Sequence, residues 1–443
     1  MSESFKGTWR LIGYGAGMAG WSVLMNLVGV MLIYFYIPPA NSGMNLLIPQ
    51  VSVFGFLTIF SLILASGRLF DAVTDPFIAW FSDRFSSRWG RRIPFILISV
   101  IPAGIFCILL FFPNHNYETS LNYVWLFLMQ LGFYFFLTVY IVPYNALMPE
   151  LAKTEDEKLR MSVVLSFTFV TGMIIASQIP LLANLAGSLF DITDAQTKFR
   201  IAIIVIVVIA CVLMFIPVLV VDEKRYCNPV VTKINIFSSV KTALSNRQFL
   251  IFMIADSSFF ITLAIISSGI LYYVKVLLGL PEEKASLFLA IMIILSLALY
   301  PMVVKLVKKM GKKKLIIFSF VIFAGLFFSV IFMGKINVPP EVFLYSLAVI
   351  AAFPVAVLGI LPYTIIAEIT DQISKEKGYR IEGMFFAVRT FGDKLGQTIG
   401  IMTFAILTLL GKDPGNDFGI RMSAFIGMTI CLIAANTFFK YKE

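Results

Sequence analysis

Two basic stretches that match each other decide the fold of this chain. The first reads DRFSSRWGRR at residues 83–92, and the second reads KLVKKMGKKK at residues 305–314. Their glycines, Gly90 and Gly311, are 221 residues apart (311 − 90), which is about half of the 443-residue chain. A self-match at this distance indicates that the chain consists of two homologous halves.

Further residues recur at nearly the same separation. They are Pro143 and Tyr144 with Pro362 and Tyr363, Glu150 with Glu368, and Arg160 with Arg380. The sequence therefore predicts an N-terminal half at residues 1–221, a polar cytosolic linker at 222–248 and a C-terminal half at 249–443. Transporters with two such halves bind their solute near the membrane midplane and expose it to each side in turn.

The stretches around these repeats are strongly apolar. Hydrophobic residues make up 59% of the chain and charged residues 14%, whereas about a quarter of a soluble protein is charged. A membrane-spanning helix needs about 20 mostly apolar residues. Twelve such runs occur, at residues 11–36, 48–80, 93–112, 121–148, 161–186, 200–221, 249–277, 284–307, 314–334, 341–369, 383–410 and 418–439. The sequence predicts an all-α membrane protein with twelve transmembrane helices in two pseudo-symmetric six-helix bundles.

Basic residues gather in alternate loops. Lys and Arg are frequent at 84–92, 153–160, 305–314 and 375–380, whereas residues 38–50 and 113–120 contain none. Because basic loops are retained in the cytosol, these loops and both termini are predicted to be cytosolic. We expect a multi-pass protein of the plasma membrane.

The same distribution argues against several functions. The net charge of +10 lies in short loops, so it follows membrane topology and does not indicate a nucleic-acid-binding surface. The single histidine, His115, lies in a loop, and the apolar runs contain no nucleophile–base constellation and no metal cluster. We therefore predict a transporter rather than an enzyme, without a cofactor, that functions as a monomer in contact with membrane lipid.

The second apolar run ends with charged residues. Arg68, Asp71 and Asp75 are three and four residues apart, which places them on one face of a helix. Charges at membrane depth are unfavourable and usually serve transport. Two carboxylates one turn apart suit a hard cation such as Na⁺, or they can share a proton. In the alternative interpretation, Arg68 only neutralises one aspartate at the membrane edge.

This motif carries a family resemblance. Arg68, Asp71, Asp75 and Pro76, followed by the stretch at 83–92, resemble the melibiose permease-like glycoside–pentoside–hexuronide:cation symporters of the major facilitator superfamily. The resemblance implies a twelve-helix bacterial carrier that binds Na⁺, Li⁺ or H⁺ near its second and fourth helices. Asp71 and Asp75 match the cation-binding carboxylates, and Thr74, Thr138 and Lys394 match further family positions.

The eleventh run carries a second charged group. Arg389 and Asp393 are four residues apart and can pair, while Lys394 lies about 100° further around the helix. Lys394 either holds an anionic substrate group, couples to the two aspartates, or belongs to a local charge cluster that locks the helix. We include Arg68, Arg389, Tyr144 and Tyr363 as further candidates for substrate binding or coupling.

The substrate is less defined than the cation. Residues 13–20 contain no acid, and Ile141 occupies the fourth-helix position at which family members carry a sugar-binding aspartate. The predicted function is cation-coupled symport, with Na⁺ or H⁺, of a sugar, a glycoside or an acidic sugar. The alternative is a cation-dependent transporter of lysophospholipids or other amphiphiles.

Charged residues at the cytosolic ends of the spans are candidates for a gate. They are Asp83, Arg84, Arg91, Arg92, Glu150, Arg160, Glu368 and Arg380. Ion pairs among them can hold the cytosolic side closed. The alternative is that the basic members serve topology alone. Asp256, in the seventh run, either forms a gate salt bridge or is a solvated acid near the start of its helix.

Overall fold

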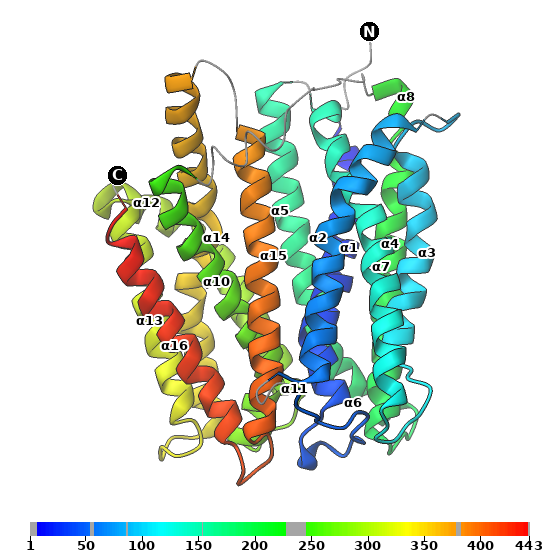
Figure 1. The fold of residues 1–443 in the computed structure, drawn as a ribbon, viewed down its shortest axis with the longest axis vertical. Helices are drawn as coiled ribbons and strands as arrows, with labels where there is room; N and C mark the ends of the chain where they lie inside the picture. Colours follow the sequence, from blue (N-terminus) through cyan, green and yellow to red (C-terminus); the bar gives the residue numbers. More distant parts are fainter. Residues whose placement is uncertain are drawn as a thin grey trace. The chain divides into compact units, whose positions relative to one another are not determined.

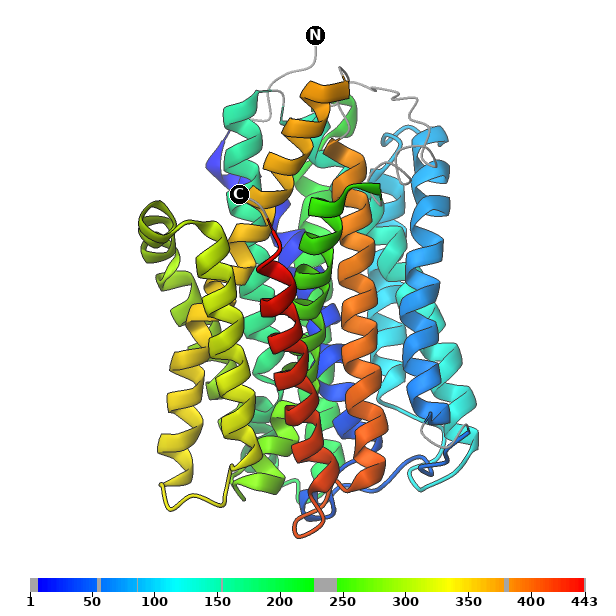
Figure 2. The same ribbon diagram turned by 60° about the vertical axis from the view of Figure 1, so that its left-hand side comes forward.

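The computed structural model describes the chain apart from residues 1–6, 54–56, 86, 153, 227–244, 378–381 and 442–443. The chain divides into two compact units, one of residues 1–53 and 62–232 and the other of residues 54–61 and 233–443. We call them the N-terminal unit and the C-terminal unit. Within each, the described regular elements are helices that run side by side (Figures 1 and 2).

The N-terminal unit begins with a long helix. Its helices are α1 (Thr8–Tyr36), η1 (Ala40–Ser42), α2 (Ile59–Arg84), α3 (Ile93–Leu110), α4 (Leu121–Leu151), α5 (Glu155–Ser177), α6 (Ile179–Leu189), α7 (Ala195–Val220) and the short α8 (Glu223–Tyr226).

The C-terminal unit also consists of helices. They are α10 (Arg247–Tyr272), η2 (Tyr273–Leu277), α11 (Glu283–Ala298), α12 (Tyr300–Met310), α13 (Lys312–Ile331), α14 (Pro340–Lys377), α15 (Glu382–Leu407), η3 (Thr408–Leu410) and α16 (Phe418–Phe438). The break in this unit lies between α11 and α12.

Side-chain caps explain where several helices begin. Thr154 and Glu157 form a capping box at the start of α5. Asp194 accepts a hydrogen bond from the Thr197 amide at the start of α7, and Asn246 accepts one from the Phe249 amide at the start of α10. Each cap satisfies a backbone N–H group that has no partner within the first turn of its helix.

The repeat seen in the sequence recurs in the structure. Gly90 and Gly311 both have positive φ angles, of 112° and 81°, a conformation that glycine adopts without steric strain. The first helix of each unit also has corresponding neighbours: α1 packs on α5 and α7, and α10 packs on α15 and α16. The matching glycines therefore have a backbone role, which is to turn the chain before the third span of each unit.

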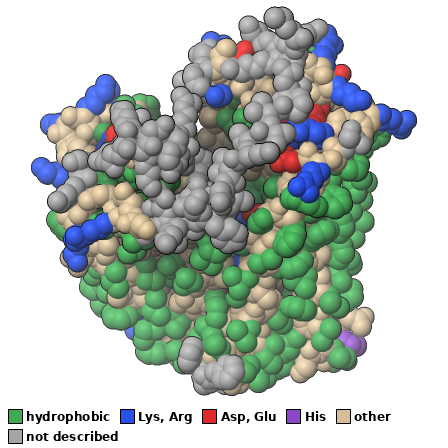
Figure 3. All heavy atoms as spheres, turned by 45° about the horizontal axis from the view of Figure 1, so that its top comes forward, with side chains coloured by type: hydrophobic (Ala, Val, Ile, Leu, Met, Phe, Trp, Pro, Cys, Tyr) green, Lys and Arg blue, Asp and Glu red, His purple; other side chains and the backbone are tan. Residues whose placement is uncertain are grey.

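All twelve predicted runs overlap helices, but fewer helices meet a strict test for membrane spans. Over the residues that the structure describes, nine are long and apolar enough, or ten if the bent pair α11–α12 is one span. Helices α2 and α15 fall outside this set, and both carry buried charge in an otherwise apolar segment. In Figure 3 the flanks of the helices are covered by apolar side chains, and Lys and Arg gather near the helix ends.

Two predicted boundaries were wrong. The second span begins at Ile59 rather than near residue 48, so the apolar run there includes non-helical chain. The run at 161–186 is two helices, α5 and α6, that meet at Gln178. Pro180, at the beginning of α6, has no N–H group to continue the hydrogen-bond ladder of α5.

Candidate cation and solute sites

The charged face of α2 is buried within the N-terminal unit. Asp71 is 4% exposed, Arg68 is 5% exposed and Thr74 is 9% exposed, while Asp75 is half-buried. The Thr74 hydroxyl donates to the backbone carbonyls of Phe70 and Asp71, at 2.9 and 3.1 Å. Its oxygen therefore lies beside the helix turn that carries the two carboxylates.

Helix α4 supplies the nearest cross-helix partner of Asp71. The Thr138 hydroxyl donates to Asp71 Oδ1 at 2.5 Å, and both residues are buried. Hydrogen bonds to an ionised oxygen are short and about twice as strong as neutral ones. The structure thus brings together Asp71 and Thr138, which are 67 residues apart in sequence.

Arg68 has an unusual environment for a buried guanidinium. Its closest polar contact is Met25 Sδ, which is 3.9 Å from Nη1, and its guanidinium carbon lies 5.2 Å from the centroid of the Tyr134 ring. Its Nε has no hydrogen-bond acceptor. Arg68 forms no ion pair with a carboxylate of the described chain. The geometry therefore does not support the interpretation in which Arg68 only neutralises an aspartate.

Three residues of α4 face α2 at intervals of four: Gln130, Tyr134 and Thr138. The Gln130 amide donates to the carbonyls of Ile63 and Leu64. A side chain at Gly67 would lie only 1.9 Å from the Gln130 nitrogen, so this glycine allows the close approach of the two helices. We did not predict Gln130 or Tyr134 from the sequence, although polar residues at this spacing in an apolar helix were a usable signal.

A second charged cluster lies within the C-terminal unit. Arg389, in α15, pairs with Asp256 of α10 through two contacts, Nε to Oδ2 at 2.6 Å and Nη2 to Oδ1 at 3.3 Å. Asp393 lies farther away, with Oδ2 4.0 Å from Arg389 Nε. The predicted pair of Arg389 and Asp393 is therefore present as a long ion pair, and Asp256 is the closer partner. The planar guanidinium fork fits both oxygens of one carboxylate, which Asp256 presents from the neighbouring helix.

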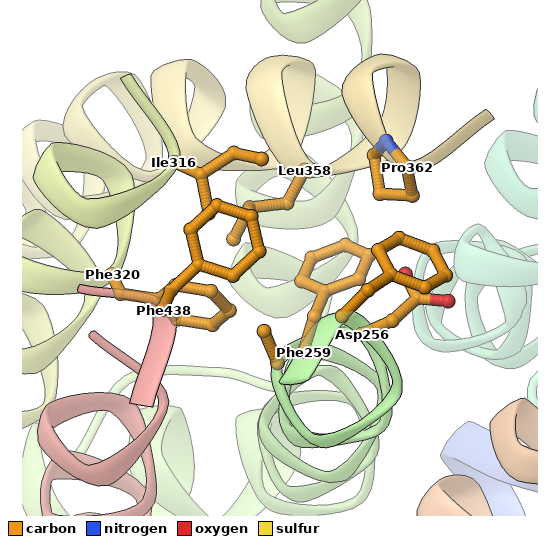
Figure 4. A pocket seen from close by; sticks show the side chains of 9 residues that line it. Asp256, Phe259, Ile316, Phe320, Leu358, Pro362 and Phe438 are labelled. Atoms are coloured by element: carbon orange, nitrogen blue, oxygen red, sulfur yellow. The ribbon is translucent and has the colours of Figure 1, made fainter. Parts of the chain in front are cut away.

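The same geometry settles the two interpretations of Asp256. Its side chain is completely buried and ion-paired, so it is not a solvated acid at a helix end. It also borders a small apolar pocket, lined by Phe259, Phe320 and Phe438 among others. Figure 4 shows the Asp256 carboxylate pointing away from the cluster of rings. The pocket thus presents an apolar surface, and we assign it no ligand.

The two repeat-related tyrosines have opposite environments. Tyr144 is completely buried and stacked on Tyr14, with ring centroids 4.5 Å apart. Each hydroxyl donates to the backbone carbonyl of the other residue, at 2.5 Å. Tyr363 is 57% exposed, and the Arg389 guanidinium carbon lies 4.3 Å from its ring centroid. Tyr363 can therefore offer a ring to a solute, whereas Tyr144 ties α4 to α1. Lys394 is half-buried.

The predicted gate residues of the N-terminal unit form one network. Glu150 Oε1 accepts Arg91 Nη2 at 3.0 Å and Arg92 Nη1 at 2.9 Å. Arg92 also pairs with Asp83 at 3.1 Å. Arg84 stands apart from this network, because its guanidinium carbon lies 4.2 Å from the ring centroid of Trp80.

A buried acid that we did not predict completes this network. Glu223, in α8, accepts hydrogen bonds from the backbone amides of Arg92 and Ile93 at 2.8 and 3.1 Å, and its carboxylate is 3.9 Å from Arg91. It thereby supplies an anion to the N-terminus of α3, where the helix dipole favours negative charge. No sequence signal marked it, because it follows the sixth apolar run as one of several polar residues.

The corresponding gate residues of the C-terminal unit are simpler. Glu368 pairs with Lys312, which follows Gly311 as Arg91 follows Gly90. Arg160, in α5, is exposed, and its predicted counterpart Arg380 lies outside the described residues. The equivalent contacts Arg91–Glu150 and Lys312–Glu368 thus tie the loop before the third span to the fourth span in each unit.

Comparison with known proteins gives a consistent result. The family model described as MFS/sugar transport protein matches residues 13–439. The glucuronide carrier protein homolog of Escherichia coli (strain K12) is 25% identical, over 80% of this chain and 78% of that protein. The sodium-dependent lysophosphatidylcholine symporter 1-A of Danio rerio is 23% identical, over 80% of this chain and 71% of that protein.

Solved structures support the fold. The crystal structure of a D-xylose–proton symporter aligns with a TM-score of 0.64 and 14% identity, covering 98% of this chain and 97% of that one. At this identity the likeness bears on the fold alone. The family match, by contrast, covers nearly the whole chain. The chain therefore belongs to the MFS/sugar transport proteins, as a member of the glycoside–pentoside–hexuronide:cation symporter family of multi-pass membrane transporters.

Proposed function

We propose that this protein is a secondary active transporter that couples a monovalent cation, Na⁺ or H⁺, to symport of a sugar, a glycoside or an acidic sugar. The observation that carries the proposal is the buried pair of Asp71 and Thr138, one helix turn from Asp75. A buried carboxylate with a hydroxyl donor is a ready oxygen site for a small cation. The family relation supports coupled transport.

The oxygens near α2 suit a monovalent ion. Asp71 and Asp75 would supply charge, and Thr74 and Thr138 would supply neutral hydroxyl oxygens. Hard cations such as Na⁺ prefer oxygen ligands of this kind, and two close carboxylates can instead share a proton. By linkage, a cation that raises the affinity for the solute is itself bound more tightly when the solute is present. That reciprocity is the thermodynamic basis of symport.

Arg68 favours an acidic solute among the possible sugars. Its guanidinium is buried, and no carboxylate among the described residues pairs with it, which is an unfavourable state for a charge. A carboxylate or sulfonate on the solute would give it a bidentate partner. Lys394 is a second candidate for such a group. Tyr363, exposed and stacked under Arg389, offers a ring face to the apolar side of a sugar.

We also propose the finer topology. Twelve spans require α2, α15 and the bent pair α11–α12 to cross the membrane although they carry charges or a break. Both termini and the basic loops would then lie in the cytosol, in the inner membrane of a bacterial cell, with a monomer as the functional unit. The gate network around Glu150 would lie at the cytosolic end of the N-terminal unit.

A second candidate function has one observation in its favour. A relative that this chain resembles over most of its length is named a sodium-dependent lysophosphatidylcholine symporter. Such an amphiphile would also use an anion-binding side chain for its phosphate group. The two functions share the cation site and differ in the solute, so one assay separates them.

The test is uptake into proteoliposomes with and without an inward Na⁺ or proton gradient. The panel of solutes contains neutral glycosides, uronic and sulfonated sugars, and one lysophospholipid. We expect one cation gradient to drive uptake of an acidic sugar, and Asp75→Asn to remove that dependence. Asp194→Asn is the matched control, because it makes the same change at an exposed helix cap and should leave coupling intact.

Other results would count against the proposal. Uptake of only the lysophospholipid would establish the second candidate. Uptake that is indifferent to both gradients, in the wild type and in Asp75→Asn alike, would make the α2 carboxylates structural. Arg68→Gln tests the solute separately, since it should lower uptake of acidic sugars far more than uptake of neutral glycosides.

A further inference from the structure

Helix α12 combines a basic face with an apolar face. The spacing of Lys305, Lys308 and Lys309, which are three and four residues after the first, places all three on one side of the helix. Val303 and Val307 lie on the opposite side, and Val303 is completely buried. Three more lysines follow at 312–314, which places six lysines within ten residues. This pattern is typical of a helix that lies in the plane of a membrane surface.

The axis of α12 departs from the axis of the preceding helix. The two helices meet at Leu299 with a bend of 54°. Pro301, near the start of α12, has no N–H group to donate to the preceding turn, which accounts for the break. In Figures 1 and 2, α12 turns aside at the end of the C-terminal unit, next to the start of α13. The bend directs the chain away from the path of a straight span.

Apolar side chains of α12 remain exposed beyond the part that packs on the protein. Met302 is 47% exposed, Val304 is 51% exposed and Met310 is 38% exposed. On the helix wheel, Met302 and Val304 lie at the two edges of the lysine face, and Met310 lies beside Val303 on the opposite side. An interfacial helix buries such residues in the outer acyl region, and its lysine stems extend toward the headgroups.

The charges of this segment are uncompensated, unlike those of its repeat in the N-terminal unit. There, Arg91 and Arg92 form ion pairs with Glu150 and Asp83, and Glu223 accepts a hydrogen bond from the Arg92 amide. Here Lys312 pairs with Glu368, but Lys305, Lys308, Lys309 and Lys314 are exposed and contact no carboxylate of the described chain. The duplicated loop has kept its positive charge, and the part of the chain that the structure describes offers no anion to these four lysines.

We propose that α12 is an interfacial helix that binds the anionic phospholipid headgroups of the cytosolic leaflet through Lys305, Lys308 and Lys309. Anionic headgroups supply the missing negative charge, and the exposed methionines and valine supply the apolar contact. Retention of positive loops in the cytosol accounts for the presence of lysines. It does not account for a bent helix that sorts them onto one face, opposite an apolar face.

The expected effect follows from surface electrostatics. Each basic residue near an anionic membrane strengthens the attraction about fivefold, so three give roughly a hundredfold preference for anionic over zwitterionic lipid. The preference should weaken as ionic strength rises, because salt screens exposed charges within about 10 Å at 0.1 M. The bound lipid also holds the start of α13 in place, so anionic lipid should raise the thermal stability of the protein.

The experiment compares three forms of the full-length protein in nanodiscs of phosphatidylcholine with and without phosphatidylglycerol. They are the wild type, the triple variant Lys305→Gln, Lys308→Gln, Lys309→Gln, and the matched triple variant with arginine at the same positions. Native mass spectrometry counts the phosphatidylglycerol molecules retained after transfer to detergent, and thermal unfolding gives the shift in Tm that phosphatidylglycerol produces.

We expect the wild type and the arginine variant to retain phosphatidylglycerol and to gain thermal stability from it. The glutamine variant should lose most of both effects and keep its stability in pure phosphatidylcholine, which shows that it folds. Equal retention in the glutamine variant and the wild type would overturn the proposal. Equal loss in the glutamine and arginine variants would also overturn it, because the positive charge would then not be the cause.

Discussion

The hydrogen bond between Thr138 and Asp71 is the contact through which the cation site can be tested most directly. The Thr138 hydroxyl lies 2.5 Å from Asp71 Oδ1, and both side chains are at most 4% exposed. Thr138→Val keeps the shape of the side chain and removes the hydroxyl. In the proposed site the hydroxyl holds Asp71 in position for Na⁺, and its oxygen can also face the ion.

The magnitude follows from the type of bond. A hydrogen bond to a charged group contributes about 1.5–3 kcal/mol. Taking about 2 kcal/mol, and about 1.4 kcal/mol for each tenfold change in affinity, Thr138→Val should raise the half-saturating Na⁺ concentration roughly thirtyfold. Uptake by proteoliposomes measured over a range of Na⁺ concentrations gives this value.

Three controls isolate the effect. Thr138→Ser keeps a hydroxyl and should retain most of the cation affinity. Thr262→Val makes the same change at a buried threonine of the C-terminal unit, whose hydroxyl donates to backbone carbonyls of its own helix, so cation dependence should be unchanged. In an Asp71→Asn background, Thr138→Val should have no further effect, because its partner is already neutral. A folded Thr138→Val variant with wild-type cation dependence would refute the reasoning.

Three further predictions concern stability in detergent, measured by thermal unfolding. Asp256→Asn should destabilise the protein by about 3–5 kcal/mol, because it leaves the Arg389 charge buried without its main partner. Adding Arg389→Gln should restore part of this loss. A double variant whose destabilisation equals the sum of the two single losses would contradict the pairing. Tyr144→Phe should cost about 0.5–1.5 kcal/mol, because it removes a buried hydrogen bond between α4 and α1, and a change within experimental error would contradict the geometry. Asp194→Ala should cost about 0.5–1 kcal/mol at pH 7 through loss of the α7 cap. Hydrogen bonds from Thr197 lower the pKa of Asp194, so this contribution is present above the unfolded pKa of about 3.9 and disappears as pH falls through the lower folded value. A difference between Asp194→Ala and the wild type that persists unchanged at low pH would exclude this cause.

Much of the fold was predictable because membrane helices follow from local composition. Each of the twelve apolar runs overlaps a helix of the structure, and the repeated glycines mark a turn with positive φ in both units. Asp71 and Thr138, which the family resemblance predicts to share a cation site, are in contact, and the cation site itself stays a prediction. The helices and turns were predictable because hydrophobicity, helix period and the backbone freedom of glycine are properties of short segments.

Partners between helices were less predictable. Arg389 forms a long ion pair with Asp393 on its own helix, as predicted, but its closer partner is Asp256, which is 133 residues earlier. Glu223 gave no signal in the sequence and proved to be a buried acceptor for the start of α3. In both cases the choice depends on which helices meet and at what height, and no local pattern encodes that.

The sequence by itself determined the membrane class, the duplication and the charged face of α2, because each is visible in composition, spacing or repetition. The tertiary structure alone decided what each charge meets: Asp71 a hydroxyl, Arg68 a thioether and an aromatic ring, and Arg389 a carboxylate. It also showed that Tyr144 is buried and Tyr363 is exposed, although the two tyrosines occupy equivalent positions in the sequence repeat. The physical reason is that burial and pairing arise only when distant segments pack, whereas helix formation and membrane insertion are decided along the chain.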